Sequence, residues 1–235
     1  MLASMNISSE LRRLLLANGA DMVGFADLRD IARDVRKSLP FGVSIAIALR
    51  PQTISQIQSG PTKQYYNEYK RANQLLDTLG HRAVQFLKEQ GHTAKWFPAT
   101  SDYDCKTLSA RLQHKTTATR AGFGWIGKCA LLVTKMFGSA VRITTVLTDA
   151  RLPTAEPMEV NFCGKCNLCV DACPGHAPSG KNWRIDSHRD HFYNAFACEK
   201  AAGEMTIRRI GIQDTICGIC IAVCPWTQKY LRRAE

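Results

Sequence analysis

The sequence contains no apolar run approaching the roughly 20 residues that a membrane-spanning helix requires, and no internal repeat or low-complexity segment. Near the N-terminus the only apolar cluster is residues 14–17, which is too short for the core of a signal peptide. Hydrophobic residues make up 45% and charged residues 22% of the 235 positions, which excludes a wholly disordered chain. We therefore expect a globular cytoplasmic protein that does not associate with membranes.

The sequence also lacks any long run of basic residues, although its formal net charge is +11. Residues 1–157 carry 21 Lys and Arg against 12 Asp and Glu, a net +9, and the remaining residues carry 10 against 8, a net +2. Such a balance is compatible with nucleic acid, an acidic partner protein or a phosphate-bearing cofactor. It is equally compatible with an ordinary solvated surface.

Hydrophobic periodicity predicts helices mixed with strands before about residue 150. A proline-containing segment, residues 152–157, follows them and marks a domain boundary. We therefore predict an α/β (α+β) fold with one domain over residues 1–155 and a small cysteine-rich domain over residues 156–235. The expected elements are helices over 8–18, 62–90 and 116–121, and strands over 43–49, 130–134 and 141–147.

Cysteine is the informative residue, because eight of the ten cysteines fall between Cys163 and Cys224. In a chain without an export signal, such a density indicates metal ligands rather than disulfides. Residues 163–174 read C-x2-C-x2-C-x3-C-P, the spacing with which bacterial ferredoxins bind [4Fe–4S] clusters. Residues 217–225 read C-x2-C-x3-C-P, and Cys198 stands alone between the two groups.

In two-cluster ferredoxins the cysteine before the proline of each run binds the other cluster. Zinc is the alternative, because CxxC pairs also bind zinc, but zinc does not explain the two Cys-Pro dipeptides. Two cubanes, each of charge about −2 with its four thiolates, lower the net charge from +11 to roughly +7. The ferredoxin rule predicts Cys163, Cys166, Cys169 and Cys224 as ligands of cluster one, and Cys173, Cys198, Cys217 and Cys220 as ligands of cluster two.

Several other motifs are weaker. Residues 122–127 fit GxGxxG, but this fingerprint must follow a strand and open a helix, whereas here the order is reversed. The same stretch resembles a P-loop except that Cys129 replaces the Ser or Thr that would hold magnesium. We interpret Cys105 and Cys129 as buried small residues rather than nucleophiles. His188 and His191 are interpreted as a surface pair.

Two stretches resemble the epoxyqueuosine reductases and their reductive dehalogenase relatives. The first is residues 114–128 (HKTTATRAGFGWIGK), continuing through residues 131–133 and 145–149, and the second is the cysteine module up to Trp226. Together they span about half of the chain. The resemblance implies a nitroreductase-like domain that binds cobalamin in a base-off form, followed by a two-cluster ferredoxin-like domain. It also implies the same eight cluster ligands.

The resemblance further implies which residues contact the corrin. His114 is in addition a candidate proton donor, because the pKa of an unperturbed histidine lies near neutrality; Lys115 and Tyr103 are further candidates. The implied corrin contacts are Ser109, Ala110, Arg111, Leu112, Gln113, His114, Lys115, Leu132, Ile143 and Glu199.

Two departures from the family separate this sequence from queuosine chemistry. Family members carry an aspartate proton donor seventeen residues before the tryptophan of the glycine-rich stretch, and here that position is Leu108. The sequence also ends eleven residues after Cys224, without the helical repeats that hold tRNA in the family. We therefore expect a substrate other than tRNA, since RNA binding also requires a basic patch or a recognisable module.

The resulting hypothesis is a redox protein in which a ferredoxin or flavodoxin supplies electrons through two [4Fe–4S] clusters to a corrinoid. The substrate is then a small organic molecule. Two alternatives stay open: a non-catalytic protein that stores or reduces a corrinoid, with a corrinoid protein as partner, and a ferredoxin-like electron carrier without cobalamin.

Overall fold

The computed structural model describes residues 2–99 and 103–234, and the side chains of residues 6–99 and 104–234. Helices and strands are mixed along the chain, which confirms the predicted α/β class. None of the described helices is long and apolar enough to cross a membrane. The helices are α1 (Leu2–Ala17), α2 (Pro51–Ile54), α3 (Lys63–Glu89), α4 (His114–Arg120), α5 (Leu168–Asp171), the 3-10 helix η1 (Arg189–His191), α6 (Ala195–Ile210), α7 (Ile219–Ala222) and α8 (Pro225–Arg233). The strands are β1 (Met22–Asp27), β2 (Phe41–Ala48), β3 (Ala94–Phe97), β4 (Tyr103–Asp104), β5 (Ser109–Ala110), β6 (Gly124–Ile126), β7 (Leu132–Thr134) and β8 (Val141–Thr148).

The chain forms two compact units whose segments alternate along the sequence. The first unit contains Met1–Ile47, Ala72–Phe123 and Arg142–Met158, and the second contains Ala48–Arg71, Gly124–Val141 and Glu159–Glu235. The last crossing between the units, after Met158, lies three residues beyond the predicted boundary at residue 155. Two earlier segments also belong to the second unit, which no composition signal in the sequence indicates.

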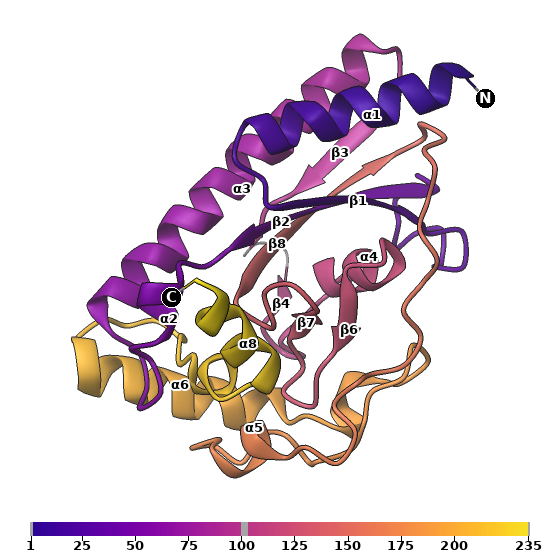
Figure 1. The fold of residues 1–235 in the computed structure, drawn as a ribbon. Coiled ribbons are helices and arrows are strands. Elements are labelled where there is room, and N and C mark those ends of the chain that lie inside the picture. The colour runs from indigo at the N-terminus through magenta and orange to yellow at the C-terminus, as the bar shows by residue number, and fades with distance from the viewer. Residues whose placement is uncertain (1, 100–102, 235) are drawn as a thin grey trace. The chain divides into compact units, whose positions relative to one another are not determined.

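The first unit is built on a four-stranded sheet in the order β1-β2-β8-β3. Strands β1 and β2 pair antiparallel from Met22 opposite Ala46 to Asp27 opposite Phe41, and β3 pairs antiparallel with β8. Figure 1 shows α1 and α3 along one face of this sheet and α4 near the other. Side chains alternate accordingly on β1: the guanidinium of Arg12 on α1 lies over Phe25, whereas the Gly24 position faces Phe123, just after α4.

Helix α4 approaches the sheet closely because the strands carry glycine beneath it. A Cβ on Gly24 would lie 2.6 Å from the Phe123 ring, and a Cβ on Gly42 would lie 2.7 Å from the methyl group of Thr117. Thr117 is fully buried. Helix α4 therefore depends on these two positions having no side chain.

Replacing Gly42 with alanine should destabilise the first unit by about 1–3 kcal/mol, the usual cost of overpacking. The added methyl group must displace Thr117 and the Leu28 side chain, 2.9 Å away, in a packed interior. Urea unfolding measures the change. The matched control is Gly203→Ala on α6, where the nearest atom to the new methyl is 3.8 Å away; equal destabilisation of both variants would contradict the prediction.

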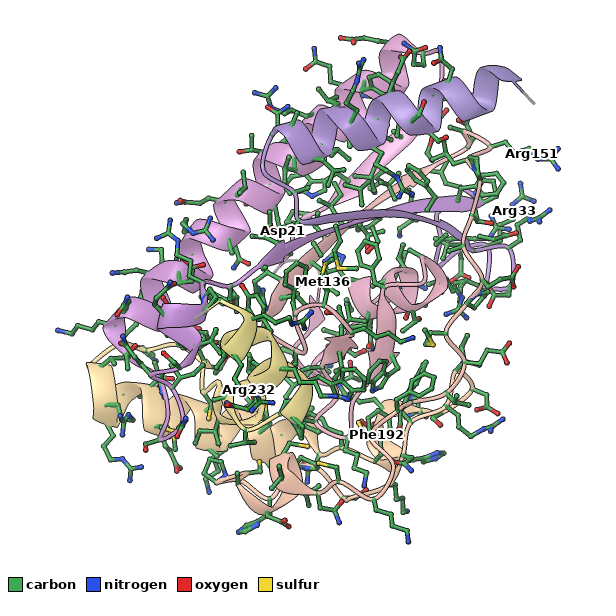
Figure 2. The ribbon with its side chains drawn as sticks, in the orientation of Figure 1. Asp21, Arg33, Met136, Arg151, Phe192 and Arg232 are labelled. Carbon is green, nitrogen blue, oxygen red and sulfur yellow. The ribbon has the colours of Figure 1, made fainter. Side chains whose placement is uncertain are left out.

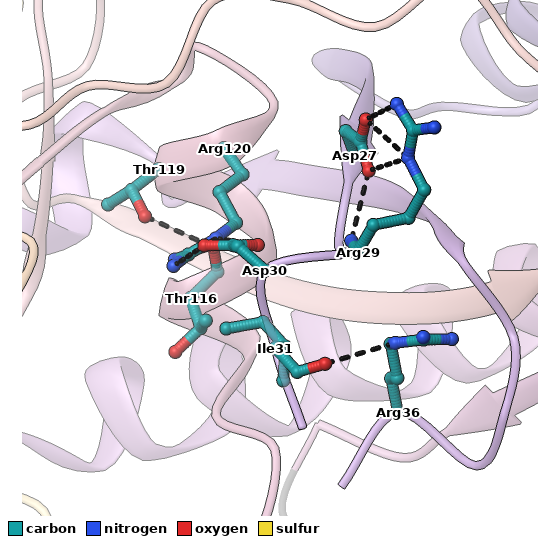
Figure 3. Close-up of polar contacts among 8 residues, drawn as sticks. All are labelled: Asp27, Arg29, Asp30, Ile31, Arg36, Thr116, Thr119 and Arg120. Atoms are coloured by element: carbon teal, nitrogen blue, oxygen red, sulfur yellow. Dashed lines mark hydrogen bonds and ion pairs between the residues drawn. The ribbon is translucent and has the colours of Figure 1, made fainter. Parts of the chain in front are cut away.

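Ion pairs connect α4 to the loop that follows β1 (Figure 3). Arg120, whose side chain is 9% exposed, donates through its Nε to Asp30 at 3.0 Å and through a terminal nitrogen at 2.5 Å. In the same loop Arg29 pairs with Asp27, and the guanidinium of Arg29 holds the pKa of Asp27 below its usual value. These contacts fix the C-terminal end of α4, and its N-terminal end carries the implied corrin segment.

The second unit packs the segment 48–71 against the cysteine-rich region. The Gly60 position faces Met205 and Arg209 on α6, and Arg209 Nε donates to the Pro61 carbonyl at 3.2 Å. Gly218 has φ +85° and lies against Ile57 and Tyr65, where a side chain would be both strained and obstructed. The cysteine-rich region is therefore covered by residues far from it in sequence.

The GxGxxG stretch has the reversed context that the sequence indicates. Helix α4 precedes it, and residues 124–126 within it form β6, which pairs with β7. Because no strand leads into it and no helix leads out of it, the stretch does not form a dinucleotide-binding turn.

Candidate functional site

A cavity of about 140 Å³ lies inside the second unit. Its walls combine thiols with aromatic and aliphatic side chains, including Phe162, Trp226 and Val133. Trp125, fully buried, packs edge-on against both Phe162 and Trp226 with ring centroids 5.1 Å apart. The thiols on the wall are those of Cys129, Cys163, Cys166, Cys169, Cys220 and Cys224. The cavity is thus a sulfur-rich space with an apolar surround.

Local structure explains how Cys163, Cys166 and Cys169 reach one cavity. The N–H of Cys166 donates to the Cys163 carbonyl at 3.0 Å, closing a tight turn in which Gly164 has φ +54°. Asn167 stands at the N-cap of α5, and Cys169 lies in the first turn of that helix. The chain therefore brings three thiols together within seven residues.

Cys224 reaches the same cavity from the far end of the chain. It is the N-cap residue of α8, and Pro225 occupies the first helical position, where the missing N–H costs nothing. Thr227 in this helix accepts from the Ser139 N–H at 3.1 Å, which links α8 to the segment after β7. Burial raises the pKa of the Cys224 thiol. All four cysteines predicted for cluster one thus line one cavity.

Three of the four cysteines predicted for cluster two lie near one another. The thiols of Cys173, Cys198 and Cys217 are close enough to perturb one another electrostatically, and burial raises the pKa of both Cys198 and Cys217. The Ala177 N–H donates to the Cys173 sulfur at 3.4 Å. Cys220, the fourth predicted member, lines the first cavity.

These thiols fit clusters by the chemistry of the donor set. The eight cysteines predicted as ligands, two of them in Cys-Pro dipeptides, all lie in the second unit, and the Ala177 N–H donates to the Cys173 sulfur. Among the described residues, no three His, Cys, Asp or Glu side chains gather closely enough to hold a single metal ion.

Lys128 is a site residue that the sequence motifs did not single out. Only 3% of it is exposed, it lines the cavity, and its Nζ donates to the Asn167 side chain at 2.8 Å. Its ammonium group places a positive charge beside the turn that carries Cys166 and Cys169. In the sequence this lysine ends both the near P-loop at residues 122–128, which pointed to a different chemistry, and the family-like stretch at residues 114–128.

Replacing Lys128 with methionine should lower the midpoint potential of one cluster by roughly 60–120 mV. A unit charge several ångströms from a partly buried group contributes a few kcal/mol, and about 59 mV corresponds to a tenfold change in a one-electron equilibrium. Anaerobic redox titration followed by EPR measures the potential. The control is Lys165→Met, an exposed lysine between Cys163 and Cys166 whose charge is screened by solvent; equal shifts would refute a special role for Lys128.

The first unit contains most of the implied corrin contacts. Ser109 and Ala110 form β5, which pairs with β4, and Gln113 donates to the Ser109 hydroxyl at 2.9 Å. Arg111 is exposed and pairs with Asp34 at 3.1 Å, whereas Leu112 is buried. His114 and Lys115 begin α4, and Ile143 lies half-buried on β8. Leu132 and Glu199 belong to the second unit, on β7 and α6.

His114 is held as a neutral side chain. Its Nε2 donates to the Pro98 carbonyl at 3.0 Å, so its Nδ1 accepts from the Thr145 hydroxyl at 3.0 Å. Burial lowers the pKa of His114 to about 4, and the positive charges of Arg142 and Lys115 act in the same direction. Because both ring nitrogens have partners and the ring is neutral at pH 7, this geometry favours a positioning role over proton donation.

The other sequence expectations have mixed outcomes. Cys129 is buried as predicted, but the prediction for Cys105 was wrong, because that thiol is exposed in the loop between β4 and β5. His188 and His191 are exposed with ring centroids 6.1 Å apart, which confirms the surface pair.

Leu108 has φ +50°, a left-handed conformation unusual for leucine. The side chain of Tyr103 lies outside the described residues.

The comparison with protein families defines the class of the second unit's site. Residues 162–227 match the 4Fe-4S double cluster binding domain. The match includes all eight cysteines of the two groups. The chain is therefore an iron–sulfur protein with a double cluster domain.

Curated relatives then indicate the particular kind of iron–sulfur protein. Epoxyqueuosine reductase of Synechococcus sp. RCC307 is 28% identical over 230 residues, covering 97% of this chain and 67% of the relative. The Pseudomonas aeruginosa enzyme of the same name is 28% identical over 175 residues, covering 74% and 47%. The chain thus spans about half to two thirds of these relatives, and it is similar to epoxyqueuosine reductases.

Solved structures share the fold. The catabolic reductive dehalogenase NpRdhA, in complex with 3-bromo-4-hydroxybenzoic acid, superposes with a TM-score of 0.71 at 16% identity, covering 99% of this chain and 34% of that one. Epoxyqueuosine reductase from Bacillus subtilis gives 0.60 at 21% identity, covering 95% and 66%. That enzyme has an aspartate catalytic loop that swings out of its active site. The fold is therefore that of these two groups of enzymes.

Proposed function

We propose that this chain is a cobalamin- and iron–sulfur-dependent redox protein, which receives electrons at its double cluster domain and uses them at a base-off corrinoid. The observation that carries the proposal is the cavity lined by Cys163, Cys166, Cys169 and Cys224. These four residues come from two ends of the cysteine module, and spacing alone had grouped them.

The residues of the second unit would hold and tune two [4Fe–4S] clusters. Such clusters supply one-electron transfer at potentials set by charge, hydrogen bonds to sulfur and solvent exposure. The chain provides each of these factors: the buried Lys128 ammonium, the Ala177 N–H on the Cys173 sulfur, and the aromatic wall around Trp125. We assign Cys163, Cys166, Cys169 and Cys224 to one cluster, and Cys173, Cys198, Cys217 and Cys220 to the other.

The residues of the first unit would bind the corrinoid without supplying an imidazole to its cobalt. His114 is the histidine within residues 109–115, and both of its nitrogens are already hydrogen-bonded. A corrinoid held here would have no histidine ligand from this segment, and its cobalt centre would carry the reductive chemistry when bound. One of the solved dehalogenase structures with this fold is described as explaining B12-dependent dehalogenation. Similarity to that protein supports a corrinoid here.

The proposed partners follow from the same scheme. A ferredoxin or flavodoxin would deliver single electrons, and the substrate would be a small organic molecule or the corrinoid of another protein. Leu108 occupies the position at which family resemblance expects a proton-donating aspartate, and a leucine side chain cannot transfer a proton. We therefore do not propose tRNA as the substrate.

Anaerobic reconstitution with iron and sulfide, followed by cobalamin titration, tests the proposal. We expect about eight irons per chain, and an EPR signal of base-off cobalt(II) on cobalamin addition. An Ala110→Arg variant should weaken cobalamin uptake while leaving the iron content unchanged, because a long charged side chain enters the β5 segment. The matched control is Arg33→Ala, an exposed residue of the same unit (Figure 2).

Eight irons without cobalamin uptake would contradict the proposal and leave a ferredoxin-like electron carrier. Cobalamin uptake without turnover of any candidate substrate would support the non-catalytic corrinoid-binding alternative. Turnover of reductant in the presence of a halogenated or oxidised organic compound would identify an enzyme.

A further inference from the structure

The surface beside the cavity predicted to hold cluster one has exposed apolar side chains. Phe162 lines this cavity, and 51% of the residue is nevertheless exposed. Met136, which lies in the turn after β7 and is labelled in Figure 2, is 53% exposed. A single aromatic side chain therefore extends from the cavity to the surface of the second unit. An electron that arrives at this surface has a short route to the cluster.

Two lysine ammonium groups lie over aromatic rings that line the cavity. The Nζ of Lys135 is 5.9 Å from the centroid of the Phe162 ring, and the Nζ of Lys229 is 4.5 Å from the centroid of the Trp226 ring. Both lysines are exposed. Trp125 packs edge-on against both rings. One aromatic cluster therefore connects the two lysines.

Arg233 joins α8 to the turn that carries Lys135 and Met136. Its Nη2 donates to the Met136 carbonyl at 2.9 Å, its Nε donates to the Lys229 carbonyl at 3.1 Å, and the residue is exposed. Residues 124–141 and 225–235 together carry five Lys and Arg against one Glu. We call this surface the α8 patch, and it consists of Lys135, Met136, Phe162, Trp226, Lys229 and Arg233.

We propose that the α8 patch is the docking surface for a reduced acidic ferredoxin, which passes one electron to cluster one. The inference rests on the proposed function, because it requires a cluster in the cavity. The ferredoxin centre loses one electron, the [4Fe–4S] cluster changes from the 2+ to the 1+ state, and no proton moves. Positive charge around the point of entry attracts a negatively charged donor and orients it.

The chemistry of the α8 patch is that of a transient interface. Weak electron-transfer complexes bury little surface, and an interface typically has an apolar, aromatic centre and a polar rim. Met136 and Phe162 provide the apolar part here, and three basic side chains provide the charged part. A merely solvated basic surface does not require its lysines to lie over the rings that line a cofactor cavity.

Stopped-flow absorbance measures electron transfer from a reduced plant-type [2Fe–2S] ferredoxin to the reconstituted full chain. At low ionic strength the Lys135→Glu/Lys229→Glu variant should react at least about tenfold more slowly than the unsubstituted protein, because both steering charges are reversed. The difference should shrink at high salt, which screens exposed charges. The matched control is Lys181→Glu/Arg208→Glu, which makes the same charge change at two exposed residues of the second unit that do not line the cavity.

The control variant should react at nearly the rate of the unsubstituted protein. Equal slowing of the two double variants would overturn the proposal, because total charge rather than the α8 patch would then set the rate. Transfer from a reduced flavodoxin but not from the ferredoxin would also overturn it. So would a dimer of the unsubstituted protein that the Lys135→Glu/Lys229→Glu variant disrupts, because a second copy would then cover the patch.

Reduction by photoexcited deazaflavin, a small molecule that needs no docking surface, shows whether the clusters are intact. It should reduce all three proteins equally, and EPR of the reduced clusters should be unchanged among them. Clusters that accept electrons from deazaflavin but not from the ferredoxin would overturn the docking surface alone. Absent clusters would contradict the proposed function as well.

Discussion

A protein with Cys163→Ala and Cys224→Ala together should retain one intact [4Fe–4S] cluster, whereas a protein with Cys163→Ala and Cys173→Ala should retain none. The reason is that the ligand sets cross between the two cysteine groups: Cys224 lines the same cavity as Cys163. Cys173, although ten residues from Cys163, lies near Cys198 and Cys217 instead. Spin quantitation of the reduced protein by EPR counts the intact clusters.

Ligand sets that do not cross between the two cysteine groups would give the opposite result. If each cysteine group held its own cluster, the pair Cys163 and Cys173 would leave one cluster intact and the pair Cys163 and Cys224 would leave none. The Cys105→Ala variant is the control, because that thiol is exposed in the first unit and belongs to neither set. It should retain both clusters.

The second large effect is a loss of stability in mild acid that depends on His114. The folded protein protonates this ring only near pH 4, because burial lowers its pKa, whereas the unfolded chain protonates it near pH 6.5. Between these values the unfolded state binds more protons, so stability falls as the pH falls. The expected loss from this group is about 2 kcal/mol between pH 7 and pH 5.

Urea unfolding at several pH values, compared between the protein and a His114→Gln variant, isolates this contribution. Glutamine retains one donor and one acceptor for the Pro98 carbonyl and the Thr145 hydroxyl but does not titrate. The difference in free energy of unfolding between the two proteins should shrink by about 2 kcal/mol from pH 7 to pH 5. A His188→Gln control, on an exposed ring, should show no such trend; parallel profiles for all three proteins would rule out a buried neutral His114.

Local patterns predicted the long elements well and the short strands poorly. The helix expected over residues 62–90 is Lys63–Glu89, and the strand expected over residues 43–49 is Phe41–Ala48. Strands β1, β3 and β6 were not predicted. They are three to six residues long, and their sequences have too few positions for a period to stand out. Pairing with neighbours in the sheet, rather than local preference, stabilises them.

The residues of the candidate site were also predicted only in part from the sequence. Spacing within a tight turn identified the thiols at Cys163, Cys166 and Cys169, because the distance between neighbouring ligands is fixed by a few residues of chain. The sequence gave no reason to group Lys128 and Cys129 with these cysteines, since they are about 35–40 residues away from them in the chain. Only packing of the turn between β6 and β7 into the second unit places them on the cavity wall.

The sequence by itself determined that the chain is an α/β protein with a double cluster domain and a resemblance to epoxyqueuosine reductases. These conclusions depend on composition and on short-range spacing, which the covalent chain fixes. The tertiary structure decided which side chains are buried and which have hydrogen-bond partners. It keeps His114 neutral, leaves Cys105 exposed, and divides the chain into two units whose segments alternate along the sequence. Burial and hydrogen bonding set these properties, and both depend on residues that meet only when distant segments pack together.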